Sequence, residues 1–275
     1  MKVQTRHSGI WQLSSTILAV EDGCIVVDPG YFPRELDELA RLAAAHGGAR
    51  AVVFTHGHWD HVIGWSAFPE AEVWVSPALA EAMTSRSARA CKDLDAARDF
   101  DGRWYVERPA ELDWPPPARV RALHEGHPQR LGAAALQPLL LPGHSPDGLA
   151  LLVPEAQLLL VGDYLSPCEI PFVDDAAAYC ATLARLLAIL GDGNSDGDLA
   201  LGTVRQVIPG HGPLLSAAAA RQIAAADLRY LRALLACAQA GDTAGALALP
   251  LPRAATVPGM ADHHRENCQA VGLSL

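Results

Sequence analysis

Seven residues that can bind a metal ion follow short apolar runs of the sequence. The run 51–54 leads directly into Thr-His-Gly-His-Trp-Asp-His, which holds four potential ligands within six positions. Three further runs, 136–141, 158–161 and 204–208, are each followed within three residues by glycine and then by histidine or aspartate. A single histidine is usually a core or surface residue, but this set together indicates a metal site. The candidate ligands are His56, His58, Asp60, His61, His144, Asp163 and His211.

Five imidazoles and two carboxylates suit zinc, manganese or iron. Seven ligands are too many for one tetrahedral ion, so we expect two ions with three histidine or aspartate ligands each and one shared carboxylate. The first set is His56, His58 and His144, the second set is Asp60, His61 and His211, and the shared ligand is Asp163.

The apolar runs have the length and composition of buried strands. Ligands at the ends of adjacent strands converge on one edge of a sheet, where glycines allow tight turns. Helices are predicted over four segments, and the first of them stops at Gly47-Gly48. These helices span about 34–46, 77–90, 176–190 and, after the cap Ser216, residues up to about 240. Strands and helices alternate along the chain, which predicts an α/β (α+β) fold.

We expect a single domain over 1–275, with an excursion at about 91–130 and a helical C-terminal region at about 216–275. The excursion holds His124 and His127 and could form a lid or a wall of the substrate site. The segment 192–197 starts like a calcium loop, but it lacks the final acidic ligand and is interpreted as a polar connection.

Four of these segments resemble the metal-binding motifs of the metallo-β-lactamase superfamily, in the family's order. Thr55–His61 matches Thr-His-x-His-x-Asp-His, and 142–145, 162–163 and 209–212 resemble the other ligand motifs. The resemblance covers about residues 15–215. It implies a four-layer αβ/βα sandwich with two mixed β-sheets and the metals at the sheet edges.

The resemblance also implies a mechanism. A hydroxide that bridges two divalent ions would cleave a small ester, thioester or lactone. The ions would be zinc by preference, with manganese or iron as alternatives. Asp60 and Asp163 would be the catalytic carboxylates, with Asp60 also able to shuttle a proton. Asp28, in Val-Val-Asp-Pro-Gly, and Thr55 would orient the imidazoles from behind.

The sequence departs from the thioester hydrolases of the glyoxalase II type. Their bridging motif continues as Gly-Asp-Thr-Leu-Phe, whereas this chain has Gly-Asp-Tyr-Leu-Ser at 162–166. Lactonases of the superfamily use a tyrosine near the bridging aspartate, so Tyr164 is a candidate substrate-site residue, with strand packing as the alternative. His264 is a second candidate, with a solvated helix start as the alternative.

Two other activities stay open at this point. A persulfide-dioxygenase-like oxidoreductase uses a similar scaffold with one iron, bound by two histidines and an aspartate. A phosphodiesterase or nuclease of the superfamily is disfavoured, because Lys and Arg number 21 against 31 Asp and Glu, a formal charge of −10. The expected partner is therefore a small-molecule substrate rather than nucleic acid.

The composition and the cysteine pattern indicate the size of the core and the expected cellular location of the protein. The chain has 275 residues, of which 50% are hydrophobic, enough to bury a sizeable core. Its start lacks the apolar segment of a signal peptide, and no apolar stretch is long enough to span a membrane. Six scattered cysteines without a Cys-x-x-Cys pair indicate reduced thiols. We therefore expect a cytoplasmic protein without a membrane partner; homodimers are common in similar proteins, and a homodimer is compatible with this chain.

Overall fold

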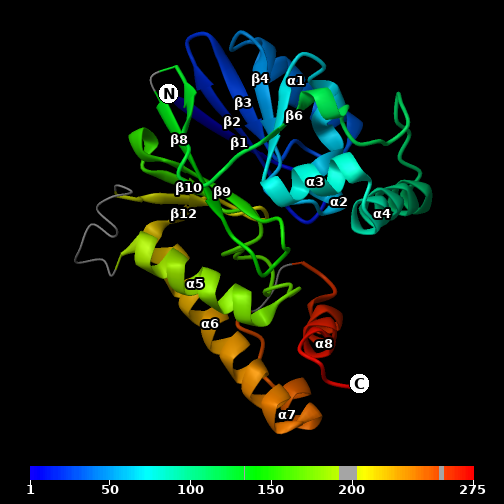
Figure 1. Ribbon diagram of the computed structural model, residues 1–275, viewed down its shortest axis with the longest axis vertical. Helices are drawn as coiled ribbons and strands as arrows, with labels where there is room; N and C mark the ends of the chain where they lie inside the picture. Colours follow the sequence, from blue (N-terminus) through cyan, green and yellow to red (C-terminus); the bar gives the residue numbers. More distant parts are fainter. Residues whose placement is uncertain (133, 192–202, 254–256) are drawn as a thin grey trace. The chain divides into compact units, whose positions relative to one another are not determined.

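The strands of the computed structural model form two mixed sheets of six strands each within the described residues, 1–132, 134–191, 203–253 and 257–275 (Figure 1). The strand orders are β1-β2-β3-β4-β5-β6 and β12-β11-β10-β9-β8-β7. Helices accompany both sheets, so the predicted α/β class with two mixed sheets is confirmed. The predicted polar connection at 192–197 lies outside the described residues.

The chain divides into two compact units, Met1–Leu140 and Leu141–Leu275. The prediction of a single domain stays a prediction. Unit 1 comprises β1 (Lys2–His7), β2 (Ser14–Val20), β3 (Gly23–Val27), α1 (Pro33–Ala44), β4 (Ala49–Val53), α2 (Trp59–Val62), η1 (Ile63–Ala67), β5 (Glu72–Val75), α3 (Pro77–Ser85), α4 (Ala88–Trp104), η2 (Pro117–Arg119), β6 (Val120–Ala122), β7 (Gln129–Leu131) and β8 (Ala134–Leu140). Unit 2 comprises β9 (Leu149–Val153), η3 (Pro154–Ala156), β10 (Leu158–Leu160), α5 (Ala176–Leu190), β11 (Gln206–Ile208), β12 (Leu215–Ser216), α6 (Ala217–Ala240), α7 (Thr243–Leu247) and α8 (Met260–Ala270).

The sheet of unit 1 begins as an antiparallel meander and continues in parallel. β1, β2 and β3 pair antiparallel, whereas β3, β4, β5 and β6 pair parallel. β3 and β4 are continuously apolar at their carboxyl ends, as expected for parallel strands that are buried on both faces. Their carboxyl ends therefore lie at the same edge of the sheet, which is where the first ligand motif begins.

The first helix of unit 1 starts where the sequence predicts it. Pro33 occupies the first turn, where its missing N–H costs nothing, and the Glu35 carboxylate accepts a hydrogen bond from the Phe32 N–H at 3.2 Å. Leu36, Leu39 and Ala43 form the buried face. The helix ends at Ala44, two residues earlier than predicted.

The region after β5 corrects the sequence analysis. A single helix was expected over 77–90, but α3 ends at Ser85 and Arg86 adopts a left-handed conformation with φ 49°. The Ser87 hydroxyl then caps a second helix by accepting from the Ala90 N–H at 3.2 Å. That helix, α4, runs to Trp104, so the first part of the predicted excursion at 91–130 is a regular helix.

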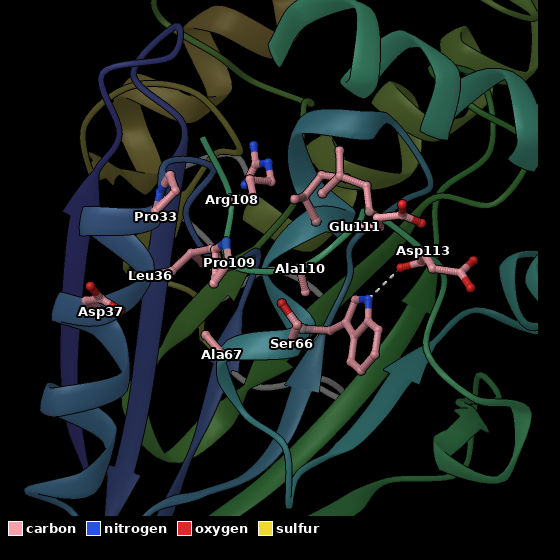
Figure 2. A pocket seen from close by; sticks show the side chains of 13 residues that line it. Pro33, Leu36, Asp37, Ser66, Ala67, Arg108, Pro109, Ala110, Glu111 and Asp113 are labelled. Atoms are coloured by element: carbon pink, nitrogen blue, oxygen red, sulfur yellow. Dashed lines mark hydrogen bonds between the residues drawn. The ribbon is translucent and has the colours of Figure 1, made fainter. Parts of the chain in front are cut away.

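After α4 the chain folds back over α1 and η1. A small cavity of about 130 Å³ lies beneath this segment, lined by residues of α1 and η1 and by 108–113 (Figure 2). The Trp65 indole N–H donates to the Asp113 carbonyl at 2.8 Å, and Arg86 forms a bidentate ion pair with the Asp113 carboxylate at 2.8 and 3.1 Å. These contacts give the segment a defined path although it contains no strand or long helix.

The helices of unit 2 match the predicted segments closely. The Asp175 carboxylate caps α5 through the N–H groups of Ala177 and Ala178, and the Ser216 hydroxyl caps α6. α6 ends at Gly241, which has φ 66°. The two helices pack against each other (Figure 1). Among the described helices none is both long enough and apolar enough to cross a bilayer.

Candidate metal centre

The ligand motif of unit 1 leaves the carboxyl end of β4. After Phe54 the chain passes through Thr55 and places its four ligands at the start of α2. His56, Asp60 and His61 are buried, whereas His58 is partly exposed. A buried carboxylate among imidazoles is costly unless it is paired or binds a cation, so this concentration of polar groups indicates a ligand site.

Asp28 supports this motif from the end of β3, the strand beside β4. One carboxylate oxygen, Oδ1, accepts from the Thr55 N–H at 2.8 Å, and the other, Oδ2, accepts from the Thr55 hydroxyl at 2.7 Å. Asp28 Oδ2 also lies 3.0 Å from His61 Nδ1. Asp28 thus contacts both Thr55 and His61, and the predicted role of Asp28 and Thr55 in orienting metal ligands stays a prediction.

The imidazoles of unit 1 lie against one another. His56 Nε2 is 3.0 Å from His58 Nδ1, and the rings of His56 and His61 have centroids 4.1 Å apart. His61 Nε2 faces Asp60 Oδ2 at 3.6 Å. Within this unit, four potential ligand atoms therefore lie close together.

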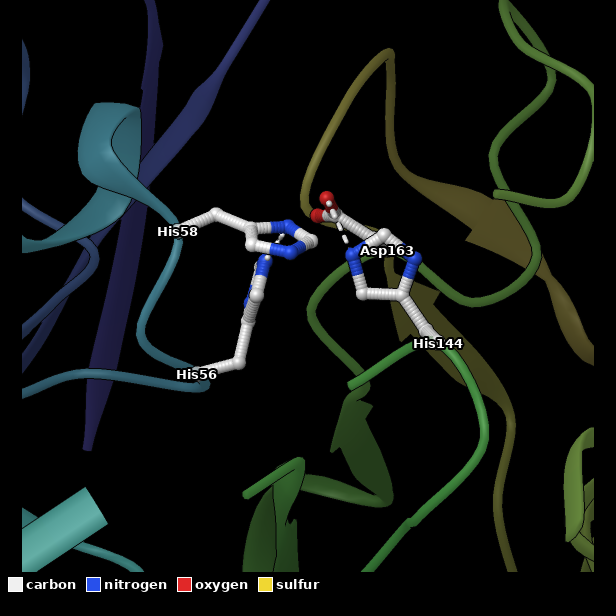
Figure 3. Close-up of side chains that lie close together, drawn as sticks. All are labelled: His56, His58, His144 and Asp163. Atoms are coloured by element: carbon white, nitrogen blue, oxygen red, sulfur yellow. Dashed lines mark hydrogen bonds and ion pairs between the residues drawn. The ribbon is translucent and has the colours of Figure 1, made fainter. Parts of the chain in front are cut away.

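Unit 2 carries the remaining three ligands. Asp163 and His211 follow β10 and β11, which are parallel neighbours, so their loops leave the same sheet edge. Asp163 Oδ2 lies 3.3 Å from His144 Nε2 and 3.6 Å from His211 Nε2. Figure 3 shows the His144–Asp163 contact and, from unit 1, the His56–His58 contact as dashed lines. Asp163 therefore lies between two histidines of unit 2.

The space for the Asp163 carboxylate depends on a glycine. A Cβ at position 210 would collide with Asp163 Oδ1 and would lie 2.6 Å from the Gly162 carbonyl carbon. Gly210 also donates its N–H to the Gly162 carbonyl, which joins the two ligand loops. Glycine therefore precedes His211 in this motif because any larger residue would occupy the space of the Asp163 carboxylate.

The orientation of the imidazoles fits a bound cation. His144 Nδ1 lies 3.0 Å from the Phe172 carbonyl, and because a carbonyl can only accept, Nδ1 must donate and Nε2 must carry the lone pair. That lone pair faces a carboxylate oxygen of Asp163 at 3.3 Å. Two acceptors at this distance repel each other unless a proton or a metal ion lies beside both, and imidazole with carboxylate is a donor set for divalent metals.

His61 and His211 repeat this arrangement. Each has Nδ1 toward one carboxylate, Asp28 at 3.0 Å or Glu169 at 4.0 Å, and Nε2 toward another, Asp60 or Asp163, at 3.6 Å. A carboxylate behind the ligating histidine is the usual way in which proteins fix the tautomer that binds a metal. Sequence analysis did not identify Glu169, because nothing in Pro-Cys-Glu-Ile distinguishes it from an ordinary loop residue.

Arg89 is a second residue that sequence analysis did not identify. It lies in the first turn of α4, and its Nη2 is 3.4 Å from His58 Nε2. The sequence places Arg89 at the end of a predicted helix that the structure divides, so its position beside His58 follows only from the break at Arg86 and Ser87.

Tyr164 is buried and engages the backbone that carries His144. Its hydroxyl accepts from the His144 N–H at 3.0 Å and lies 2.8 Å from the Pro142 carbonyl. Burial raises the pKa of this phenol above its usual value, so the hydroxyl stays protonated and can donate. Within unit 2, these contacts are those of a residue that positions the ligand loop; the predicted substrate-site role of Tyr164 stays a prediction.

Replacing Tyr164 by phenylalanine is expected to lower the free energy of unfolding by about 1–3 kcal/mol, because the His144 N–H loses its buried acceptor. Urea unfolding monitored by circular dichroism measures this change. Tyr105→Phe is the control, since Tyr105 is 90% exposed. A variant of unchanged stability that loses most of its kcat would instead indicate direct participation of the hydroxyl in catalysis.

His264 lies on α8 and is buried, so the expectation of a solvated helix start is wrong. Its Nδ1 is 2.8 Å from the Tyr230 hydroxyl and its Nε2 is 3.1 Å from the Ala246 carbonyl. Asn267, one turn later, donates to the Pro171 carbonyl at 2.7 Å. His264 thus helps to join α8 to α6 and α7, and its predicted substrate role stays a prediction.

Comparison with known proteins gives one family. The model of the metallo-beta-lactamase superfamily matches residues 9–236. The probable metallo-hydrolase YqgX of Bacillus subtilis (strain 168) is 26% identical over 167 residues, which are 60% of this chain and 72% of that protein.

Solved structures give the same result. TTHA1623 in a di-iron-bound form is 26% identical, with a TM-score of 0.55, over 78% of this chain and 96% of that one. The metallo-beta-lactamase family protein TTHA1429 from Thermus thermophilus is 19% identical, with a TM-score of 0.64, over 86% and 82% of the two chains, and shows the fold alone.

Proposed function

Because the chain belongs to the metallo-β-lactamase superfamily and is a metal-dependent hydrolase, we propose that it binds two divalent ions and hydrolyses a small ester, thioester or lactone. The observation that carries the proposal is the orientation of His61, His144 and His211. Each presents Nδ1 to a carbonyl or carboxylate acceptor and Nε2 to a ligand carboxylate. This arrangement leaves Nε2 of each ring beside a proposed ligand carboxylate, which supports a metal ion bound there.

The proposal assigns three ligands to each ion and shares one carboxylate. Asp163 is the shared ligand, which its position between His144 and His211 supports. The di-iron form of TTHA1623 supports a site for two ions in a protein of this kind. The two sets are His56, His58 and His144 for one ion, and Asp60, His61 and His211 for the other.

The bound ions would acidify a water molecule and polarise the carbonyl of the substrate. The chain's own residues would do three further things. Asp28 would hold the His61 ring by charge, with its carboxylate 3.0 Å from Nδ1, and the Phe172 carbonyl would hold the His144 ring by accepting a hydrogen bond from Nδ1. Asp60 would accept a proton at a carboxylate oxygen and deliver it to the leaving group.

Metal analysis is the direct test of this proposal. The protein is purified without a chelator or a histidine tag, its metals are measured by inductively coupled plasma mass spectrometry, and panels of lactones, esters and thioesters are then assayed. About two zinc or manganese ions per chain together with turnover would support the proposal.

Two outcomes would contradict it. About one iron per chain, with oxygen uptake in the presence of a persulfide, would instead favour the dioxygenase-like activity that the ligand motifs leave open. Failure to bind metal even after reconstitution would show that the assignment of the ligands is wrong.

Replacing Asp28 by asparagine is expected to weaken metal binding about 10- to 100-fold, because the neutral amide no longer holds His61 Nδ1 in place. Competition with a chelator of known affinity measures the change, and circular dichroism checks the fold. Asp95→Asn is the matched control, since Asp95 is exposed on α4. Equal metal affinity in Asp28→Asn and wild type would remove Asp28 from the site.

A further inference from the structure

An aromatic cavity of about 560 Å³ opens on unit 1 beside the ligand motif. Its volume lies within the range of pockets that bind small molecules. Aromatic rings from four segments form half of its lining: the β1–β2 loop, the loop before α1, α2 and α4. The residues that matter here are Trp11, Phe32, Trp59, Ala96, Phe100 and Trp104.

The rings pack against one another, Trp11 edge to face on Trp59 and Phe100 tilted against Trp59. The centroids of Trp59 and Phe100 are 5.0 Å apart, and those of Trp11 and Trp59 are 5.4 Å apart. At the rim, however, Trp11 is 38% exposed and Trp104 is 63% exposed. Exposed aromatic surface gathered around a concavity is typical of a ligand-binding groove, because a bound apolar group removes that surface from water.

The cavity is connected to the ligands through the chain itself. Trp59 lies between His58 and Asp60 in the ligand motif, and its ring forms part of the cavity. Trp59 therefore joins the cavity to the ligand motif, because its two neighbours in the chain are proposed metal ligands.

Helix α4 also runs from the ligand motif to the cavity. Arg89 contacts His58, and Ala96 and Phe100 follow 7 and 11 residues later, each within about 20° of Arg89 around the helix. At 1.5 Å per residue they lie about 10 Å and about 16 Å along the axis from Arg89. One stripe of α4 thus carries both Arg89, which contacts His58, and two residues that line the cavity.

We propose that this cavity binds the apolar acyl group of an elongated ester or thioester, with the scissile carbonyl at the ligand motif. The inference rests on the proposed hydrolase function and specifies its substrate. Among the described residues that line the cavity, the charged ones are one acid and one base, Asp99 and Arg103. The lining therefore favours an uncharged hydrocarbon group over an anion or a cation.

A chain-length series tests the proposal kinetically. For p-nitrophenyl esters or thioesters from acetyl to decanoyl, kcat/KM of the metal-loaded wild type is expected to rise by up to about fourfold per methylene that the cavity buries. Ala96→Phe fills the cavity, and Trp104→Ala removes part of its wall. Both variants are expected to lose at least tenfold with the decanoyl substrate and less than twofold with the acetyl substrate.

The control is Tyr105→Asn, which removes an exposed neighbouring ring that does not line the cavity. Asparagine tolerates the left-handed backbone of Tyr105, φ 54°. This variant is expected to keep the wild-type dependence on chain length. If all three variants and the wild type show the same dependence, the cavity does not bind the acyl group and the proposal is overturned.

A binding measurement separates this inference from the proposed function. Decanamide, an amide that resists hydrolysis, is titrated while tryptophan fluorescence is recorded, since three tryptophans line the cavity. Saturable binding that Ala96→Phe weakens at least tenfold supports the cavity even if no substrate is turned over. Equal binding of decanamide by Ala96→Phe and wild type would overturn the proposal. So would a dimer whose interface covers the cavity and excludes decanamide, and which the Trp104→Ala substitution dissociates.

Discussion

Replacing Asp163 by alanine is expected to reduce kcat by at least about 10³-fold and to lower the metal content from two ions to one or fewer. The reason is the position of the carboxylate, 3.3 Å from His144 Nε2 and 3.6 Å from His211 Nε2. Without it, two histidines lose the shared anion that would neutralise the ions between them. A loss of 10³ in rate corresponds to about 4 kcal/mol of barrier.

The measurement combines metal analysis, steady-state kinetics and circular dichroism on the same preparation. Asp262→Ala is the control, because Asp262 is an exposed carboxylate of the same unit on α8. The far-ultraviolet spectrum should be unchanged, since Asp163 lies in a loop and its removal deletes no strand or helix contact. Full activity of Asp163→Ala would contradict the two-ion proposal.

Replacing Gly143 by alanine is expected to lower the free energy of unfolding by more than about 3 kcal/mol and to displace His144. Two independent features require glycine here. The backbone has φ 129°, which alanine rarely adopts, and an added Cβ would collide with the backbone of Tyr179. The colliding atoms belong to the backbone of α5, which cannot move aside as the end of a flexible side chain can. The loop that carries His144 must therefore move instead.

Urea unfolding and metal titration measure the two effects of Gly143→Ala. The matched control is Gly102→Ala, since an added Cβ at that position in α4 meets no atom within 4 Å. There the same substitution should be neutral or should stabilise by up to about 1 kcal/mol, because alanine favours the helix. A Gly143→Ala variant that unfolds like the wild type would show that the loop adapts without cost.

Asp163→Ala and Gly143→Ala are expected to impair metal binding for different reasons, and the stability of the metal-free proteins distinguishes them. Asp163→Ala removes a ligand from an intact loop, whereas Gly143→Ala keeps every ligand and moves the loop that carries one of them. In metal-free protein the first should therefore leave the free energy of unfolding nearly unchanged, whereas the second should lower it. Only the second depends on the packing of α5 against the loop.

The sequence indicates candidate ligands because metal binding restricts residue type and spacing together. His, Gly and Asp recur at fixed offsets after apolar runs, and parallel strands bring those offsets to one sheet edge. The helices α5 and α6 were also predictable. Asp175 and Ser216 are N-cap residues of the two helices, and Gly191 and Gly241 directly follow their last residues. These features are local, so a single sequence contains them.

The region 88–104 was not predictable in the same way. Its charged residues obscure the apolar positions, and only Leu94, Ala90 and Ala97 are buried along its inner face. The stop at Arg86 depends on a left-handed residue that is not glycine, which is uncommon. Contacts with the rest of unit 1 decide this helix, and with it the positions of Arg89 and of the aromatic cavity.

The sequence by itself determined the α/β class and the superfamily and indicated a candidate ligand set, since these depend on residue type, spacing and strand-length apolar runs. Only the tertiary structure decided other contacts around the candidate ligands: Glu169 near His211, the hydroxyl of Tyr164 on the His144 loop, and the buried state of His264. These contacts join residues that are distant in the chain, and no local pattern encodes them. Their physical cause is the packing of strands and helices, which places each polar group where a partner must satisfy it.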